Sequence, residues 1–136
     1  MTGTLVASAH LESDGPPHRQ SIRVGHHTLV ADEPPTSGGA DAGPSPFGLI
    51  LAGLIACTSI TLRMYADRKG WSLGKVRVDA RMFRDADGNG RRIERIIRVE
   101  APLTDEQKSR LAEIADKTPV TRALTSGTPI ATTFSS

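Results

Sequence analysis

The longest uncharged interval of the sequence, residues 42–62, most constrains what this chain can fold into. It opens with the letters "AGPSP" and continues as "FGLILAGLIACTSITL", from Phe47 to Leu62. Proline and glycine indicate a turn at its start. The rest predicts a helix that ends near Lys69, because Gly70 is the residue type that commonly follows a helix. The first half of this helix is apolar on nearly every side, so it must be covered on several sides.

The same interval raises the question of a membrane span. Its helical apolar part, Phe47 to Ile60, is 14 residues long, whereas a span needs about 20 residues. Runs of about 10–14 apolar residues are more often core helices. We therefore predict a buried helix and no membrane partner.

Length and composition indicate one domain over residues 1–136. The chain is 38% apolar and 24% charged, which is ordinary for a globular protein. Its net charge is only +2, and no block of basic residues alternates with aromatic ones, so we expect no nucleic-acid partner. A single cysteine excludes an intrachain disulfide and suits a reducing compartment. The first residues lack the pattern of a secretory signal, so we expect a cytoplasmic protein.

Hydrophobic periodicity predicts the remaining elements. We expect strands at 4–12, at 20–31 with a turn or bulge at Gly25, and at 129–134. Residues 32–46 should form an exposed loop, and 75–83 and 91–101 a hairpin. A second helix should begin after Thr104, which forms a capping box with Gln107. This order predicts an α+β fold in which the long central helix packs on an antiparallel sheet.

Two patterns suggest metal ligands, and neither is sufficient. The letters "DADGNG", from Asp85, match the first half of a calcium loop, but Ile96 stands where the bidentate glutamate is needed. His26 and His27 are neighbours in a predicted strand, so their side chains should face opposite sides. We therefore predict no metal site.

One arginine stands out in the strand predicted at 91–101. Arg92 and Arg98 share one face with Glu94, as expected of a solvated surface. Arg95 instead shares the apolar face with Ile97 and its neighbours. We expect Arg95 to be paired at an interface.

Cys57 is the lone cysteine, and it lies in the apolar helix. A buried cysteine usually behaves as a small hydrophobic residue. A reactive thiolate needs nearby positive charge or a helix N-terminus. The residues alone leave both alternatives open.

Three features carry a resemblance to a known family. They are the "GG" and "GPSP" letters of the loop, the apolar helix bearing Cys57, and the segment "IADKTPVTRAL" at residues 114–124. Over about residues 20–133 the chain resembles the OsmC/Ohr superfamily, the osmotically inducible and organic-hydroperoxide-resistance proteins. It is most similar to the OsmC-like branch.

The resemblance implies a thiol-dependent hydroperoxide reductase of OsmC-like fold, built as an intertwined homodimer with each active site at the subunit interface. Cys57 would be the peroxidatic cysteine, and its thiolate would become a sulfenic acid. In the family a second cysteine then forms a disulfide with it, and an arginine and a glutamate polarise and hold the thiolate. No cofactor is implied.

The sequence departs from this pattern in the partner residues. Thr118 stands where the family has its second cysteine, and the glutamate position falls near Phe47 and Gly48, neither of which is acidic. Arg19 and Arg23 are the candidates for the arginine. Thr118 before a proline is also a good helix N-cap.

We therefore expect a hydroperoxide reductase of oxidative-stress defence that is weak or uses one cysteine, and that depends on an external thiol reductant. The alternative is a non-catalytic protein that binds a small hydrophobic ligand in the interfacial apolar pocket around Cys57.

Overall fold

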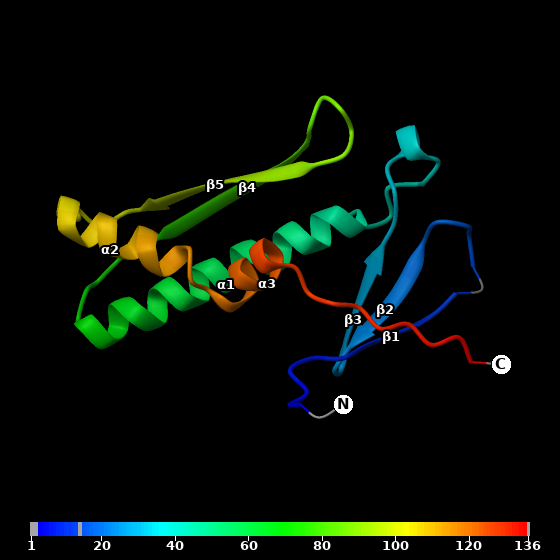
Figure 1. The fold of residues 1–136 in the computed structure, drawn as a ribbon, viewed down its shortest axis with the longest axis horizontal. Helices are drawn as coiled ribbons and strands as arrows, with labels where there is room; N and C mark the ends of the chain where they lie inside the picture. Colours follow the sequence, from blue (N-terminus) through cyan, green and yellow to red (C-terminus); the bar gives the residue numbers. More distant parts are fainter. Residues whose placement is uncertain (1–2, 14, 136) are drawn as a thin grey trace. The chain divides into compact units, whose positions relative to one another are not determined.

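The computed structural model describes residues 3–13 and 15–135, and the chain divides into two compact units, residues 1–50 and 51–136 (Figure 1). The elements, in chain order, are β1 (Ala9–Glu12), β2 (Gln20–Val24), β3 (His27–Ala31), the short 3-10 helix η1 (Pro35–Ser37), α1 (Pro46–Lys69), β4 (Val76–Arg84), β5 (Arg91–Val99), α2 (Asp105–Ala115) and α3 (Pro119–Ser126). This is the predicted α+β class, with small antiparallel sheets and three α-helices.

The first unit contains a three-stranded antiparallel sheet in the order β1-β2-β3. The strand predicted at 20–31 is in fact two strands, because Gly25 has a φ of 60° and opens a two-residue hairpin turn. The strand predicted at 4–12 forms only from Ala9. His26 lies in the turn, so its ring and that of His27 are 4.0 Å apart between centroids, not on opposite sides as predicted.

The loop that follows β3 is organised around one buried carboxylate. Asp32 is 2% exposed, and its side chain accepts hydrogen bonds from the backbone N–H groups of Glu33, Ala40 and Ala42 at 2.7, 3.2 and 3.1 Å. The Ala42 bond does most to hold the pKa of this carboxyl below its usual value, while burial opposes the shift. A Cβ at Gly39 would overlap the Glu33 carbonyl, so only glycine fits this closed loop.

The second unit packs the antiparallel hairpin of β4 and β5, with α2, against the larger part of α1. The strands are in register from Val76 opposite Val99 to Arg84 opposite Arg91. The buried core consists of Leu62, Tyr65, Ala66, Leu73, Leu111 and Ala115. Burial of these apolar side chains supplies the main stabilising term of this unit.

Helix α1 buries one face within the chain and leaves apolar residues outside it. Its buried residues are Leu54, Thr58, Leu62, Tyr65 and Ala66. Ile60 and Met64 are 60% and 58% exposed. Within the described residues α1 is the one helix long and apolar enough to cross a membrane, with 17% of its most apolar window buried. Length and composition are weak arguments, because core helices of globular proteins meet the same criterion.

The remaining local predictions have mixed outcomes. Thr104 forms the predicted capping box with Gln107, and Thr118 is the N-cap of α3 with proline in its first turn. The "DADGNG" letters form the predicted hairpin turn. The strand predicted at 129–134 is wrong: this segment has no regular structure, and its apolar Ile130 and Phe134 are 89% and 98% exposed. Among the described residues it finds no partner strand, which a strand requires.

Candidate thiol site

Cys57 lies near the middle of α1 and has a free thiol. The side chain is half-buried, less enclosed than its place in an apolar helix suggests. Its sulfur contacts the hydroxyl of Thr61, one turn further along the helix, at 4.0 Å. Because residues three and seven positions apart share a helix face, Cys57 lies on the same stripe as the exposed Ile60 and Met64. The thiol therefore lies beside an apolar surface that this chain leaves open.

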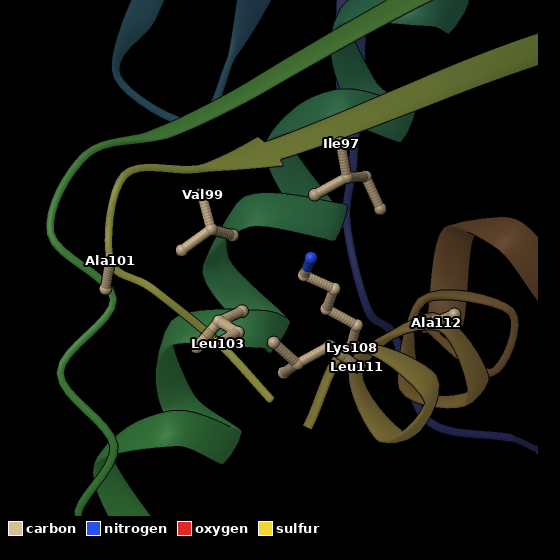
Figure 2. A pocket seen from close by; sticks show the side chains of 7 residues that line it. All are labelled: Ile97, Val99, Ala101, Leu103, Lys108, Leu111 and Ala112. Atoms are coloured by element: carbon tan, nitrogen blue, oxygen red, sulfur yellow. The ribbon is translucent and has the colours of Figure 1, made fainter. Parts of the chain in front are cut away.

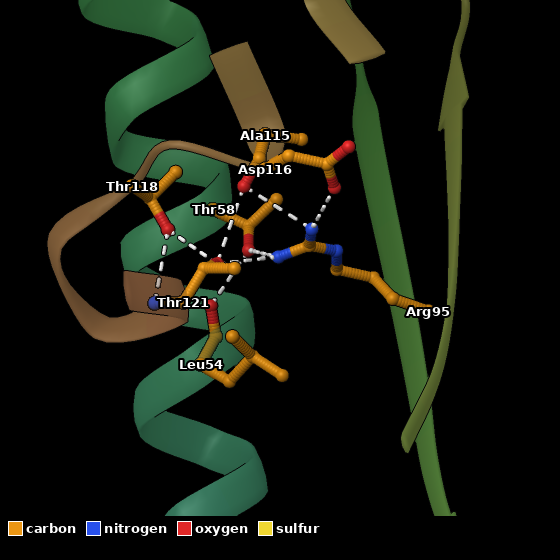
Figure 3. A network of polar contacts seen from close by, with 7 residues as sticks. All are labelled: Leu54, Thr58, Arg95, Ala115, Asp116, Thr118 and Thr121. Atoms are coloured by element: carbon orange, nitrogen blue, oxygen red, sulfur yellow. Dashed lines mark hydrogen bonds and ion pairs between the residues drawn. The ribbon is translucent and has the colours of Figure 1, made fainter. Parts of the chain in front are cut away.

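The residue after Cys57 belongs to a polar network centred on Arg95 of β5 (Figure 3). The Arg95 side chain is 14% exposed and donates through one nitrogen to the hydroxyls of Thr58 and Thr121, at 3.0 and 2.9 Å. Its other terminal nitrogen donates to the Ala115 carbonyl at 3.1 Å and to the Asp116 carboxylate at 3.3 Å. A guanidinium carries a rigid fork of donors, which suits it to bridging several acceptors at once.

The structure therefore places Arg95 as a junction between β5, α1 and the start of α3. The sequence singled out this arginine because it shares the apolar face of its strand. The described partners of Arg95 lie within the same chain, and its pairing at an interface stays a prediction. Its carboxylate partner Asp116 is 80% exposed, so water weakens this pair. Most of the buried hydrogen bonds of Arg95 therefore go to the two threonine hydroxyls and the Ala115 carbonyl.

Thr118, which the sequence predicts to stand at the position of the family's second cysteine, is fully buried within the same network. Its hydroxyl lies 2.6 Å from that of Thr121 and accepts the Thr121 N–H at 3.3 Å, as an N-cap does. Thr121 in turn donates to the Ala115 carbonyl at 3.2 Å. Both hydroxyls therefore have the partners that burial demands.

These bonds connect Thr118, through Thr121 and Arg95, to Thr58, the neighbour of Cys57. Thr58 is itself fully buried and donates to the Leu54 carbonyl at 2.7 Å. Sequence reasoning did not find Thr58 or Thr121. Thr121 had one available signal, its position three residues after a predicted N-cap.

The two candidate arginines lie in the first unit. Arg23 is in β2, opposite His10 of β1 and Thr28 of β3, and is exposed. Arg19 directly precedes β2 and is also exposed. Their role toward Cys57 stays a prediction.

Two of the hollows on the described second unit are lined by residues of β5 from the face that carries Arg95. One, of 220 Å³, lies beside Arg95 and is lined by Leu54, Ile93, Arg95, Asp116, Thr121, Leu124 and Thr125. The other, of 240 Å³, lies between β5 and α2 and is lined by Ile97, Val99, Ala101, Leu103, Lys108, Leu111 and Ala112 (Figure 2). Among residues 3–13 and 15–135, no group of three or more His, Cys, Asp or Glu side chains gathers to hold a metal.

The family described as OsmC-like protein matches residues 38–133. The chain belongs to this family. The matched span contains α1 with Cys57, the β4–β5 hairpin, and the Thr118 helix cap. The predicted resemblance is therefore confirmed.

Solved structures share the fold of this OsmC-like chain at low identity. An OsmC-like protein from Mycoplasma pneumoniae is 20% identical, with a TM-score of 0.71 over 92% of this chain and 89% of that one. An organic hydroperoxide resistance protein, OsmC, from Legionella pneumophila is 18% identical, with a TM-score of 0.69 over 90% and 91%.

A third structure, an organic hydroperoxide resistance protein from Elizabethkingia anophelis, is 21% identical, with a TM-score of 0.70 over 90% of each chain. No curated protein sequence matches this chain at a significant level. At this identity the likeness establishes the fold.

Proposed function

We propose that this OsmC-like protein is a thiol-dependent hydroperoxide reductase that uses one cysteine, Cys57, and turns over weakly. The observation that carries the proposal is the free, half-buried thiol of Cys57 beside an open apolar surface on α1. Such a surface suits the organic part of a hydroperoxide. Two structural neighbours are named organic hydroperoxide resistance proteins, which supports the same substrate class.

The reaction would have two stages. The Cys57 thiolate attacks the terminal peroxide oxygen, the O–O bond breaks, and the alkoxide leaves and takes a proton to become an alcohol. The cysteine is then a sulfenic acid, and an external thiol condenses with it, releasing water and forming a mixed disulfide. A second external thiol releases Cys57 as a thiol and leaves as the oxidised disulfide.

The external thiol is needed because no second cysteine exists in the chain. The buried and hydrogen-bonded hydroxyl at Thr118 cannot replace it, since an alcohol does not form a disulfide. A sulfenic acid that waits for a thiol from solution is exposed to further oxidation. Slow turnover follows from this arrangement.

The proposal includes a homodimer in the cytoplasm. The exposed apolar residues of α1, Ile60 and Met64 among them, support a second copy as the cover. Arg19 or Arg23 would supply the cation that favours the thiolate.

A second candidate function is the binding of a small hydrophobic ligand without chemistry, in an interfacial apolar pocket around Cys57. The observation that favours it is the buried hydroxyl of Thr118, which is used in hydrogen bonds at the position predicted for the second cysteine. This side chain stabilises the helix start and has no redox chemistry.

Measuring the rate at which the protein consumes peroxide in the presence of a dithiol distinguishes the reductase from the ligand-binding protein. Wild-type protein should consume cumene hydroperoxide, and Cys57→Ser should not, while Thr118→Ser, which leaves the thiol in place, should retain the rate. A sulfenic-acid trap should label wild type only. If Cys57→Ser consumed cumene hydroperoxide as fast as wild type, the proposed reductase activity of Cys57 would be refuted.

The pKa of the Cys57 thiol gives a second criterion, measured by the pH dependence of alkylation. A value below about 7 belongs to an activated thiol and supports the enzyme. A value near or above about 8.5, the ordinary range of a free thiol, supports the binding function.

A further inference from the structure

The outward face of the β4–β5 hairpin carries a concentration of positive charge that the proposed thiol chemistry does not use. We propose that Lys75, Arg77 and Arg98 form a binding site for a small molecule with a terminal phosphate group. The site lies on the face of β5 opposite to the one that carries Arg95, since alternate residues of a strand point to opposite sides. It is therefore separate from the network around Thr58.

The strand register brings two arginines together. Arg77 of β4 stands directly opposite Arg98 of β5, and both are exposed. Directly opposite residues share one face of a sheet, and like charges in this position are destabilising. A pair that costs stability on an otherwise regular hairpin suggests a function that needs both cations.

The carboxylates nearby do not neutralise these cations. Arg98 contacts Asp79 at 3.5 Å, and both side chains are mostly exposed, so the pair is weak. Within the described part of the chain, Arg77 makes no ion pair. Glu100 accepts the backbone N–H of Lys75 at 3.2 Å, which fixes its carboxylate at the edge of the site.

The surface is hollowed at this point. A shallow depression of 230 Å³ is lined by Lys75, Arg77, Arg98, Val99 and Glu100. Its charged lining comprises three cations and one carboxylate, an excess of two positive charges. A phosphate group carries about −1.5 to −2 charge near pH 7 and three acceptor oxygens, so it matches this excess better than a monocarboxylate does. Guanidinium groups bind such oxygens in pairs.

The charge pattern further along the hairpin indicates a small ligand. Glu94 pairs with Arg81 at 3.0 Å and with Arg92 at 3.7 Å, so both arginines on the part of the same face beyond Asp79 have a carboxylate partner and the net charge there is one positive charge. A nucleic acid needs a continuous basic track along its backbone. Among the described residues of this face, the cations without an ion pair are Lys75 and Arg77, both at one end of the hairpin.

The test is a titration of the full chain with inorganic phosphate and with glycerol 3-phosphate, at constant ionic strength. Arg77→Gln should weaken binding of the preferred probe by about tenfold, the effect of removing a charge-assisted hydrogen-bond pair. Arg81→Gln, on the same strand and face but paired with Glu94, is the matched control and should bind as wild type does. Preference for glycerol 3-phosphate identifies a phosphorylated metabolite, and equal affinity identifies the phosphate ion.

A stability measurement separates lost binding from lost folding. Without phosphate, Arg77→Gln should be at least as stable to heat as wild type, because it removes a like-charge contact. Equal phosphate affinity in wild type and Arg77→Gln would overturn the site, as would the absence of binding in wild type. Tight binding of a single-stranded oligonucleotide that Arg81→Gln weakens as much as Arg77→Gln would show a polyanion surface instead and also overturn it.

Discussion

Arg95 and Thr58 are hydrogen bonded at 3.0 Å although 37 residues separate them in the sequence. The bond joins the middle of β5 to the buried face of α1, one residue from Cys57. The same guanidinium also donates a hydrogen bond to the Thr121 hydroxyl, and that hydroxyl is hydrogen bonded to the hydroxyl of Thr118. The position predicted for the family's second cysteine is thus occupied by a hydroxyl that belongs to a satisfied, buried network.

Arg95→Met should strongly destabilise the protein. The substitution keeps an unbranched side chain but removes the donor that serves both Thr58 and Thr121. Loss of several buried hydrogen bonds from a charged group should lower the free energy of unfolding by about 3 kcal/mol. Urea unfolding followed by circular dichroism measures this change.

The matched control for this prediction is Arg81→Met, on the neighbouring strand. Arg81 is exposed and pairs with Glu94 in solvent, so its loss should cost less than about 1 kcal/mol. Equal unfolding midpoints for the two variants would mean that the buried network contributes nothing to stability.

The Asp32 loop should make stability depend on pH. The pKa of Asp32 is lower in the folded chain than its ordinary value of about 3.9. Its stabilising contribution is therefore fully present above that ordinary value and is lost as the pH falls through the folded pKa. Asp32→Asn should be less stable than wild type at neutral pH, and the difference should narrow below about pH 4.

Amide exchange locates this effect in the loop. The N–H groups of Ala40 and Ala42 donate to Asp32, so Asp32→Asn should accelerate their exchange at neutral pH. Asp41→Asn, at an exposed position of the same loop, is the control and should leave both amides protected. Unchanged protection in Asp32→Asn would contradict the structural role of this carboxylate.

Ile60→Glu should disrupt self-association. Ile60 is 60% exposed on α1, and a homodimer that covers this helix would bury it. A glutamate there would place an unpaired charge in an apolar interface. Light scattering should report a dimer for wild type and a monomer for Ile60→Glu, while Ser72→Glu, at an exposed position three residues after the end of α1, should stay dimeric. A wild-type monomer at micromolar concentration would refute the proposed assembly.

Sequence reasoning succeeded where the signal is local. The extent of α1, the β4–β5 hairpin and the caps at Thr104 and Thr118 each depend on residues within a few positions of one another. Periodicity and capping preferences read such signals directly. Two of the three features that carry the family resemblance, the helix with Cys57 and the segment with Thr118, also lie in these segments.

The predictions that were wrong or missing depend on distant partners. The segment at 129–134 has the residue types of a strand, but a strand forms only beside another strand, and none of the described strands pairs with this segment. Arg95 was recognised as unusual, yet its bonds to Thr58 and Thr121 span 37 and 26 residues. The loop at 32–46 is mostly exposed, as predicted, but no local pattern shows that the buried Asp32 carboxylate closes it.

Thr118→Cys should allow a disulfide with Cys57 on mild oxidation. Position 118 is connected through Thr121 and Arg95 to Thr58, the neighbour of Cys57, and the sequence predicts that it corresponds to the family's second cysteine. A disulfide requires Cα atoms within roughly 7 Å, so its formation tests this geometry. The variant loses the Thr118 cap, which should cost about 1 kcal/mol.

Mass spectrometry after peroxide treatment provides the measurement for Thr118→Cys. The new sulfur lies at the first turn of α3, where the helix dipole favours a thiolate that can attack a sulfenic acid at Cys57. A peptide linking positions 57 and 118 should appear, and it should be absent from Thr118→Ser, which keeps a hydroxyl cap and adds no thiol. Turnover with a dithiol should rise little, because the charges that activate Cys57 are unchanged. If peroxide oxidises Cys57 in this variant and no link forms, Thr118 does not occupy the place of the family's second cysteine, and its loss no longer explains slow chemistry.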